Sequence, residues 1–594
     1  MLLNELTLQR NRIFPNHKVK ADYWLPCMRI FLAQQNYHIG NFESNTQKII
    51  NAIELAKQQG GDLVVFSELS VCGYAPRDFL EFDDFIKKCE EAIDIIKEHA
   101  DTIGVLVGAP QRNPVKEGKD LFNAAFLLYE KEVKGVAHKT CLPNYDVFDE
   151  YRYFEPSYGW SVMEFKGKKL AVTICEDIWN LGDNPMYRKC PMDNLIPFQP
   201  DVMINLSASP FDYTHDEDRK ATIKANVAKY KLPLFYCNCV GSQTEVVFDG
   251  GSLVFDAASN LCGHLPRFEE ALQSFILNDD GTIAGLVIER ADQVSDQLLD
   301  PVQLEENLNI AQVYDAIVMG IRDYFFKMGF SKAILGSSGG IDSAVTLVMA
   351  CEALGKENVR ALLMPSPFSS THSVADAEQL SRNLGNPYDI IPIKAIYESF
   401  LKELDPLFEN LPFGITEENI QSRARGNLLM AMANKFGYIL LNTSNKSELA
   451  TGYGTLYGDM AGGLSVLGDC YKMQVYALAK YVNRGKGLMP NGKPLIPLPI
   501  ITKPPSAELR PGQKDLDSLP DYAVLDKILY QYIEKTQGPN EIKMQGFDPA
   551  LVDKVLRMVN INEYKRNQFC PIIRISPKAF GVGRRIPIVG KYLS

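Results

Sequence analysis

The sequence is short of several features that would place it in a specialised class. Its 594 residues include 7 histidines, and its 12 cysteines form no CxxC pair and no zinc-binding spacing. No apolar stretch approaches the roughly 18 residues of a membrane-spanning helix, so we expect no membrane partner. Lysine and arginine (62) are fewer than aspartate and glutamate (73), which argues against a nucleic-acid partner. Residues 1–27 lack an apolar signal core and are interpreted as the N-terminal extension of a cytoplasmic protein.

The rest of the chain shows two α/β patterns of different character. Over residues 28–275, apolar strand-like runs are interrupted by amphipathic helices at 44–59 and 217–231, which predicts a layered domain with covered sheets. Periodicity fades over residues 276–305, which are interpreted as a last hairpin and a linker. Over residues 306–594, strands such as "KAILG", "VRALLMP", "DIIPI" and "YILLNTS" alternate with helices. That alternation predicts a doubly wound parallel sheet whose ligands bind beyond the carboxyl ends of its strands.

A glycine-rich loop follows the first strand of this second pattern. The loop "GSSGGIDS" comes after "KAIL" and before the helical "AVTLVMACEAL", yet it has no Walker-type lysine. Its glycines allow close backbone approach, and its N–H groups and serine hydroxyls suit phosphate oxygens. An aspartate would repel phosphate unless it held Mg²⁺ against it. The predicted ATP-binding loop comprises Gly336, Ser337, Ser338, Gly339, Gly340, Ile341, Asp342 and Ser343.

The loop resembles the PP-loop of ATP pyrophosphatases, which split ATP between its α- and β-phosphates. Downstream, "ENIQSRARGNLLMAMAN" and "LNTSNKSELATGYGTLYGDMAGG" are similar to the NAD synthetase signature. The resemblance assigns Thr443, Lys472 and Ser506 to ATP. It assigns Asn419, Arg423, Glu448 and Lys565 to the deamidated dinucleotide, and Asp342 with Glu448 to Mg²⁺. One position departs from the pattern: Leu456 stands where short ammonia-dependent synthetases have a dinucleotide-binding lysine.

The first domain contains a possible amidase set. Glu68 ends "LVVFSE", Lys139 lies in "AHKTCLP" and Cys175 in "AVTICEDIW", so the three side chains could converge at one end of a sheet. A thiol nucleophile, a carboxylate base and a cation for the oxyanion make a complete set for amide hydrolysis. On spacing alone, a purely structural role for these three residues stays equally open.

The flanking segments resemble the nitrilase, or carbon–nitrogen hydrolase, superfamily. "FSELSVCGY", "HKTCLPNYDVFDEYRYF" and "ICEDIW" are the matching segments. The resemblance makes Cys175 the nucleophile, Glu68 the general base and Lys139 the oxyanion stabiliser, with Glu150 supporting the site. It assigns Tyr145, Glu176 and Ser209 to glutamine. Family members often have a lysine six residues after that serine, where this chain has His215; Arg219 or Lys220 is then a guess for the glutamine carboxylate.

Together the motifs resemble the glutamine-dependent NAD synthetases. The resemblance implies an N-terminal αββα nitrilase-like sandwich and a C-terminal doubly wound sheet of the PP-loop, adenine nucleotide alpha hydrolase-like, type. Ammonia from glutamine would amidate nicotinic acid adenine dinucleotide after ATP, with Mg²⁺, adenylates its nicotinate carboxylate. The expected partners are these small molecules and further copies of the chain, in at least a dimer.

Other functions stay open at this point. An asparagine synthetase would need an N-terminal cysteine nucleophile, and here Met1 precedes Leu2. A tRNA-thiolating PP-loop protein would bring a basic surface and often a CxxC pair. A non-catalytic binding scaffold is the third alternative, and an assay for AMP formation would separate it from an enzyme.

Overall fold

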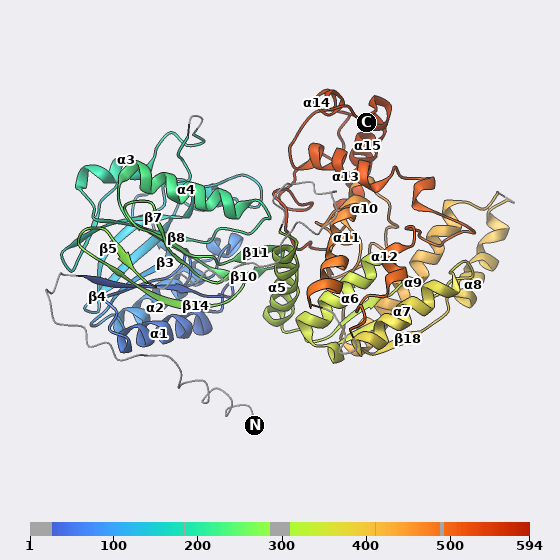
Figure 1. The fold of residues 1–594 in the computed structure, drawn as a ribbon, viewed down its shortest axis with the longest axis horizontal. Helices are drawn as coiled ribbons and strands as arrows, with labels where there is room; N and C mark the ends of the chain where they lie inside the picture. Colours follow the sequence, from blue (N-terminus) through green and yellow to red (C-terminus); the bar gives the residue numbers. More distant parts are fainter. Residues whose placement is uncertain (1–26, 183–184, 286–308, 410, 487–491, 594) are drawn as a thin grey trace.

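A computed structural model describes residues 27–182, 185–285, 309–409, 411–486 and 492–593. Two α/β bodies lie side by side, and helix α5 (Ile310–Met328) stands between them (Figure 1). The expected extension at residues 1–27 lies outside the described residues except for Cys27. No helix among the described residues is long and apolar enough to cross a membrane.

The N-terminal body contains two large sheets packed face to face. The first has the strand order β15-β14-β1-β2-β3-β4-β5 and the second β13-β12-β9-β8-β7-β6. Strands of the first sheet are β1 (Met28–Gln34), β2 (Leu63–Val65), β3 (Gly104–Arg112), β4 (Leu121–Tyr129), β5 (Glu132–His138), β14 (Ala271–Leu277) and β15 (Ile283–Ala284). Strands of the second are β6 (Met163–Phe165), β7 (Lys168–Ile174), β8 (Val202–Ser207), β9 (Leu234–Asn238), β12 (Leu253–Phe255) and β13 (Leu261–His264). A separate ribbon pairs β10 (Val240–Gln243) with β11 (Val246–Asp249).

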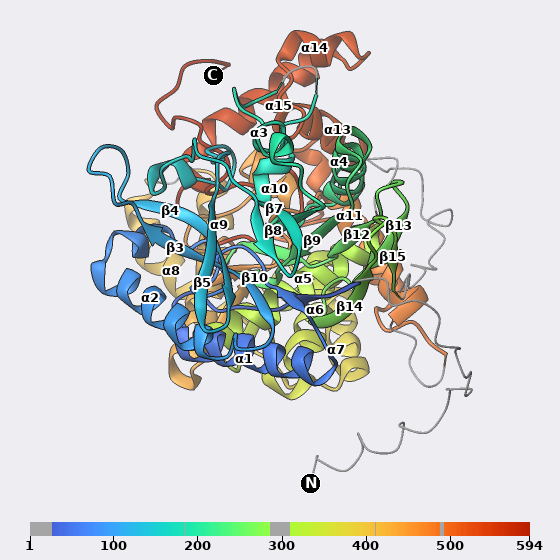
Figure 2. The same ribbon diagram turned by 90° about the vertical axis from the view of Figure 1, so that its left-hand side faces the viewer.

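Helices cover the outer face of each sheet. Helices α1 (Phe42–Gln58) and α2 (Asp83–Glu98) lie on one side, and α3 (Pro191–Leu195) and α4 (His215–Tyr230) on the other, in both views (Figures 1 and 2). The sheets meet through alternate side chains such as Leu32, Val65 and Ile204, all fully buried. The side chains that alternate with these along the strands, such as Phe31 and Val64, point to the opposite face of the sheet and pack toward α1 and α2. These four layers confirm the predicted αββα sandwich.

The C-terminal body is built on a five-stranded, wholly parallel sheet of order β18-β17-β16-β19-β20. Its strands are β16 (Ala333–Gly336), β17 (Val359–Leu363), β18 (Tyr388–Ile390), β19 (Ile439–Asn442) and β20 (Leu464–Ser465). Leu335 faces one helical layer and Ile334 the other, so both faces of the sheet are buried. The predicted doubly wound sheet is therefore confirmed.

Helices fill both sides of this sheet and extend beyond its end. Besides α5 they are α6 (Ile341–Leu354), α7 (Thr371–Leu384), α8 (Lys394–Leu404), α9 (Ile415–Phe436), α10 (Lys446–Thr451), α11 (Lys472–Tyr481), α12 (Leu498–Thr502), α13 (Tyr522–Ile533), α14 (Pro539–Met544), α15 (Pro549–Ile561) and α16 (Glu563–Arg566). Helices α10, α13 and α15 share a smaller apolar cluster that includes Leu449, Leu525 and Val555.

The two bodies share an apolar seam. Phe211, Val240 and Val247 of the N-terminal body belong to the same buried cluster as Val313 and Ile317 of α5. The seam also has a polar part. Asp323 of α5 accepts hydrogen bonds from Asn36 Nδ2 (2.7 Å) and from the Ser242 backbone N–H (2.8 Å). The Lys327 ammonium donates to Asn36 Oδ1 and to the carbonyls of Tyr37 and Ser242.

The observed elements differ from the sequence reading mainly at their edges. Strands β14 and β15 form the hairpin expected near the end of the domain and belong to the first sheet, so that sheet extends past the boundary placed at residue 275. The remainder of the segment 276–305, residues 286–305, lies outside the described residues. Strand β20 has two residues and strand β5 is polar and half-exposed, so neither gave an apolar run in the sequence.

Candidate active sites

A buried cluster of charges lies at one end of the two facing sheets. Glu68 follows β2 and Lys139 follows β5, while Glu150 opens the short 3-10 helix η2 (Glu150–Arg152). The Lys139 ammonium lies 2.7 Å from Glu68 Oε1 and 2.7 Å from Glu150 Oε1. Asn123 Nδ2 donates to Glu68 (2.7 Å), and the Tyr74 hydroxyl donates to Glu150 (2.7 Å). Each carboxylate is therefore paired and hydrogen-bonded, as buried charges require.

Cys175 stands on a tight turn immediately after β7. It begins the 3-10 helix η3 (Cys175–Ile178) with φ of 44°, in the left-handed region that a non-glycine residue rarely adopts. Asp177 holds this turn, because its carboxylate accepts from the N–H groups of Ile174 (3.0 Å), Thr140 (3.0 Å) and Cys141 (2.8 Å). The same carboxylate thus fixes the cysteine turn against the segment that contains Lys139.

Burial sets the protonation states of this cluster. Burial raises the pKa of the Cys175 thiol well above its usual value, the charge of Glu68 adds to the rise, and Lys139 opposes it. Burial also raises the pKa of Glu150, to about 7, against the lowering effect of Lys139. For Lys139 itself, burial disfavours the cation, but Glu150 and Glu68 outweigh it and raise the pKa. At neutral pH the cluster therefore contains a protonated thiol and a cationic lysine.

The residues matched to glutamine lie beside the cysteine turn. The Tyr145 hydroxyl donates to Glu176 (3.0 Å), and Ser209 Oγ lies 2.8 Å from His215 Nε2. The half-buried His215 ring stacks on Trp179 with centroids 4.8 Å apart, and loss of solvent contact lowers its pKa. A neutral imidazole therefore occupies the position where family members often have a cation.

The two cations guessed for the glutamine carboxylate have other partners. The Arg219 guanidinium is fully buried and pairs with Asp249 at 2.8 Å. Lys220 pairs with Asp216 at 2.8 Å on the surface of α4. Both cations are thus engaged by carboxylates, and no local sequence pattern pointed to Asp249 as the partner of Arg219.

The C-terminal body anchors both loops that bear glutamine-binding candidates. Asp146, next to Tyr145, pairs with the Arg574 guanidinium at 2.5 Å. In the loop after Ser209, the Tyr213 hydroxyl donates to Glu534, and the Tyr213 N–H donates to the Ile575 carbonyl at 3.1 Å. Glu534 in turn lies 2.7 Å from the ammonium of Lys446, the first residue of α10. The shape of the cysteine site thus depends on the neighbouring body.

The PP-loop connects β16 to α6 at the carboxyl edge of the parallel sheet. Gly339 has φ of 77°, and a Cβ atom there would lie 2.1 Å from the Ser373 carbonyl oxygen, so only glycine fits. Ser338 Oγ accepts from the Gly340 N–H at 3.1 Å. Among the described residues, Ser337 Oγ is buried without a hydrogen-bond partner, and it lines the adjoining cavity. The loop therefore presents an unsatisfied hydroxyl to a ligand.

Two carboxylates expected to hold Mg²⁺ meet at this loop. The Lys472 ammonium lies 2.5 Å from Asp342 Oδ2 and 3.3 Å from Glu448 Oε1, so a cation already joins the two side chains. Asn445 donates to Asp342 (2.9 Å) and caps α10 by accepting from the Glu448 N–H (3.0 Å). Burial raises the pKa of Glu448 to about 8, while Lys472 lowers it. Paired carboxylate oxygens beside a phosphate loop are a donor set that fits Mg²⁺.

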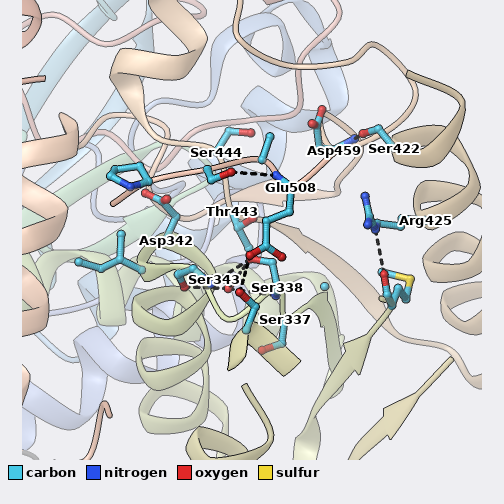
Figure 3. Close-up of a pocket in the computed structure, with 18 of the residues that line it drawn as sticks. Ser337, Ser338, Asp342, Ser343, Ser422, Arg425, Thr443, Ser444, Asp459 and Glu508 are labelled. Atoms are coloured by element: carbon cyan, nitrogen blue, oxygen red, sulfur yellow. Dashed lines mark hydrogen bonds between the residues drawn. The ribbon is translucent and has the colours of Figure 1, made fainter. Parts of the chain in front are cut away.

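A cavity of about 300 Å³ opens above the PP-loop (Figure 3). Thr443 and Ser506 line it, as do Asp342, Glu448 and Lys472. An arginine that the sequence reading passed over, Arg425 of α9, also lines it. Among the described residues, its guanidinium makes one hydrogen bond, from Nε to the Met364 carbonyl (3.0 Å). The remaining N–H groups are available to a ligand, and burial lowers the pKa of Arg425.

The residues matched to the dinucleotide lie apart from this cavity, with the exception of Glu448. Asn419 Oδ1 accepts from Thr455 (2.8 Å), and Arg423 Nε donates to the Leu456 carbonyl (3.2 Å). Lys565 donates to the carbonyls of Gly452 and Gly454, each at 2.8 Å. All three thus contact residues 452–456, the loop in which Leu456 replaces the expected lysine and packs against an apolar cluster.

Comparison with known proteins identifies the family of each part of the chain. Residues 29–293 match the carbon-nitrogen hydrolase family and residues 313–569 match the NAD synthase family. The chain is 43% identical to the glutamine-dependent NAD(+) synthetase of Synechocystis over 568 residues (94% of this chain and 98% of the relative), and 41% identical to that of Thermotoga maritima over 584 residues (95% and 99%).

A solved structure gives the same result. The glutamine-dependent NAD+ synthetase from Acinetobacter baumannii, in complex with adenosine diphosphate, matches with a TM-score of 0.72 and 39% identity, covering 95% of this chain and 98% of that one. The similarity extends through both bodies of the fold. The chain belongs to the family of glutamine-dependent NAD(+) synthetases.

Proposed function

We propose that the two sites divide the synthesis of NAD between them, with Cys175 releasing ammonia from glutamine and the PP-loop cavity consuming it. The observation that supports this most directly is that each body of the chain contains a lysine between two carboxylates. Lys139 lies between two carboxylates in the domain that contains Cys175, and Lys472 lies between two carboxylates beside an open phosphate loop. The proposal thus assigns each half of the family's reaction to named residues of this chain.

In the first stage the Cys175 thiol attacks the side-chain amide carbon of glutamine while Glu68 takes the thiol proton. Lys139 stabilises the oxygen that becomes negative. Collapse of this intermediate breaks the C–N bond, the departing nitrogen receives the proton from Glu68, and ammonia leaves a thioester. Water, deprotonated by Glu68, then hydrolyses the thioester to glutamate. Tyr145, Glu176 and Ser209 hold the substrate, with Glu176 facing its α-amino group.

In the second stage an oxygen of the nicotinate carboxylate attacks the α-phosphorus of ATP, and the bond to pyrophosphate breaks. The PP-loop hydroxyls and N–H groups hold the departing pyrophosphate, and Lys472 offsets its charge. Ammonia then attacks the acyl carbon and displaces AMP, which leaves the amide of NAD. Asp342 and Glu448 would hold Mg²⁺, which neutralises phosphate charge when bound.

We assign Asn419, Arg423 and Lys565 to the dinucleotide through the loop 452–456, whose carbonyls and hydroxyl they contact. Because Leu456 offers no charge, these three side chains would supply the polar contacts on that side. Thr443, Ser506 and Arg425, which line the cavity itself, would contact ATP.

Two broader features complete the proposal. All twelve cysteines are free thiols, which supports a reducing, cytoplasmic setting. Phe79 and Phe82 are exposed beside an apolar cavity that Phe148 and Phe248 also line, which supports a homo-oligomer joined there. Light scattering at increasing protein concentration tests the second point, and a mass of one chain throughout would contradict it.

The function is tested with glutamine labelled with ¹⁵N on its side-chain amide. The protein is incubated with ATP, Mg²⁺ and nicotinic acid adenine dinucleotide, and the products are analysed by mass spectrometry. We expect one ¹⁵N in the NAD formed, with AMP and pyrophosphate in equal amount. Unlabelled NAD, or ADP in place of AMP, would contradict the proposed division of labour.

A further inference from the structure

Glu508 places a negative charge in a cavity otherwise suited to phosphate. It lines the cavity above the PP-loop (Figure 3), and its carboxylate accepts hydrogen bonds from the start of α7. Three donors surround that carboxylate: the Ser370 N–H (3.1 Å), Ser370 Oγ (3.0 Å) and Ser373 Oγ (2.7 Å). Charge-assisted bonds of this kind are the stronger ones, and the helix N-terminus favours an anion. The carboxylate is therefore well satisfied without any ligand.

The turn at the start of α7, which binds the Glu508 carboxylate, also supports the phosphate loop. Ser370 is the N-cap of α7, and its hydroxyl accepts from the Ser373 N–H at 3.1 Å. The Ser373 carbonyl lies directly against Gly339, in the space that a side chain would occupy. A shift of the turn 370–373 would therefore move a backbone contact of the PP-loop.

Glu508 belongs to the segment 503–509. Within it, the Ser506 hydroxyl accepts from the Glu508 N–H at 3.2 Å, and the Lys503 ammonium donates to Ser373 Oγ at 3.0 Å. Glu508 itself has φ of 50°, a conformation that costs a glutamate free energy and needs compensating contacts. Its three hydrogen bonds provide them.

We propose that Glu508 is a positioning residue that closes the ATP cavity by fastening the segment 503–509 to the N-terminus of α7. Through this fastening, Ser506 and Lys503 are held at the rim, and the turn 370–373 is held against Gly339. The proposal rests on the function proposed above for the cavity. It assigns Glu508 no contact with the reacting atoms.

The test compares Glu508→Ala and Glu508→Gln with Glu378→Gln, a control on α7 whose carboxylate pairs with Arg382 on the protein surface. Hydrogen–deuterium exchange is measured on the full chain without substrates. We expect faster exchange in residues 366–380 and 503–513 for Glu508→Ala, and an intermediate effect for Glu508→Gln, which keeps one acceptor oxygen.

In the ammonia-driven reaction, the KM for ATP should rise roughly 10- to 100-fold in Glu508→Ala, the loss expected when hydrogen bonds to a charged group are removed. The KM for the dinucleotide and the glutaminase rate should stay near wild type.

A fall in the KM for ATP would overturn the proposal, because Glu508 would then obstruct phosphate. Unchanged exchange in both segments would overturn it as well. Adding Ser373→Ala to Glu508→Ala should neither raise the KM for ATP nor speed exchange beyond the effect of the single change, and full additivity would contradict the fastening. The exchange measurement does not depend on activity. A wild-type chain that forms no AMP would therefore refute the proposed function, and the exchange data alone would then decide whether Glu508 fastens the segment.

Discussion

The cysteine site and the ATP cavity satisfy their charges in different ways. Around Cys175, Lys139 meets two carboxylates, and both of these have further hydrogen-bond donors inside the protein. Around the PP-loop, a buried Ser337 hydroxyl lacks a partner, Arg425 uses one of its N–H groups, and Lys472 holds two carboxylates together. The first site is preorganised, and the second is completed by its ligands. The same chain thus combines a preorganised cysteine site with a cavity some of whose polar groups lack partners within the described residues.

The largest expected effect separates the two sites outright. Cys175→Ala should abolish glutamine-dependent NAD synthesis, because the nucleophile is lost, while synthesis from high ammonium continues at the wild-type rate. Steady-state assays with each nitrogen source measure both. Cys262→Ala, at a half-buried thiol on β13, is the control and should lose neither activity. Equal loss of both activities in Cys175→Ala would mean that the thiol is structural.

The ATP cavity should respond in the opposite way. Asp342→Asn and Glu448→Gln should each lower the ammonia-driven rate by roughly 10³-fold, since each removes a negative charge from the proposed Mg²⁺ site, and the metal's charge stabilisation is worth several kcal/mol. Glutamine hydrolysis should persist in both variants. Rates are measured over a range of Mg²⁺ concentrations, and wild-type behaviour of Asp342→Asn at limiting Mg²⁺ would refute the metal assignment.

Lys139→Met tests what preorganisation contributes at the cysteine site. Removing the cation should slow thioester formation roughly 10²–10³-fold, the loss expected for one oxyanion donor. The variant also leaves two buried carboxylates facing each other, so Lys139→Met combined with Glu150→Gln controls for excess negative charge. Alkylation of Cys175 is followed against pH beside the rate of thioester formation. A shifted alkylation profile with intact thioester formation at its new optimum would limit Lys139 to positioning Glu68.

Arg425, which lines the cavity, and Arg423, which contacts the Leu456 carbonyl outside it, separate the two proposed substrate contacts. Arg425→Met should raise the KM for ATP about 10-fold or more, because a charge-assisted hydrogen bond is lost. Arg423→Met, the matched change two residues earlier on α9, should mainly raise the KM for the dinucleotide. Initial rates with each substrate varied in turn provide the comparison, and the reverse pattern would exchange the two assignments.

The smallest expected effect is on stability. Asp526 is fully buried behind α10, where it accepts hydrogen bonds from Ser447 Oγ and the Met473 N–H, and burial raises its pKa to about 7. Since the folded state keeps this proton more readily than the unfolded state, the contribution of Asp526 to stability falls as pH rises from about 4 to about 7. Asp526→Asn should gain Tm relative to wild type across that window and no further above it. A constant difference at all pH values would contradict the raised pKa.

Much of the fold could be predicted because its strands are buried on both faces. Apolar runs such as residues 333–336 and 439–442 stand out in the sequence for that reason. The half-exposed β5 and the two-residue β20 lack this signal. Their place depends on pairing with β4 and β19, which a local pattern does not specify.

The candidate sites were predictable where a residue follows a strand or lies in the glycine-rich loop. Glu68, Lys139, Cys175 and Asp342 are of this kind. The residues that hold them were missed: Asp177 accepts from the Thr140 N–H across 37 residues of sequence, and Asn445 contacts Asp342 across 103 residues. Such partners are chosen by tertiary structure, and a side chain like Asn445 otherwise reads as an ordinary helix cap.

The anchoring of Asp146 and Tyr213 by the second body has a consequence for how the chain is made. At roughly 5–20 residues per second, Arg574 leaves the ribosome between about 20 and 85 seconds after Asp146. During that interval the N-terminal half can fold its sheets, but the loops beside Tyr145 and Ser209 have no counterpart to hold them. The proposed glutamine site is therefore translated first, but the contacts that hold its loops form only after the second body has been made.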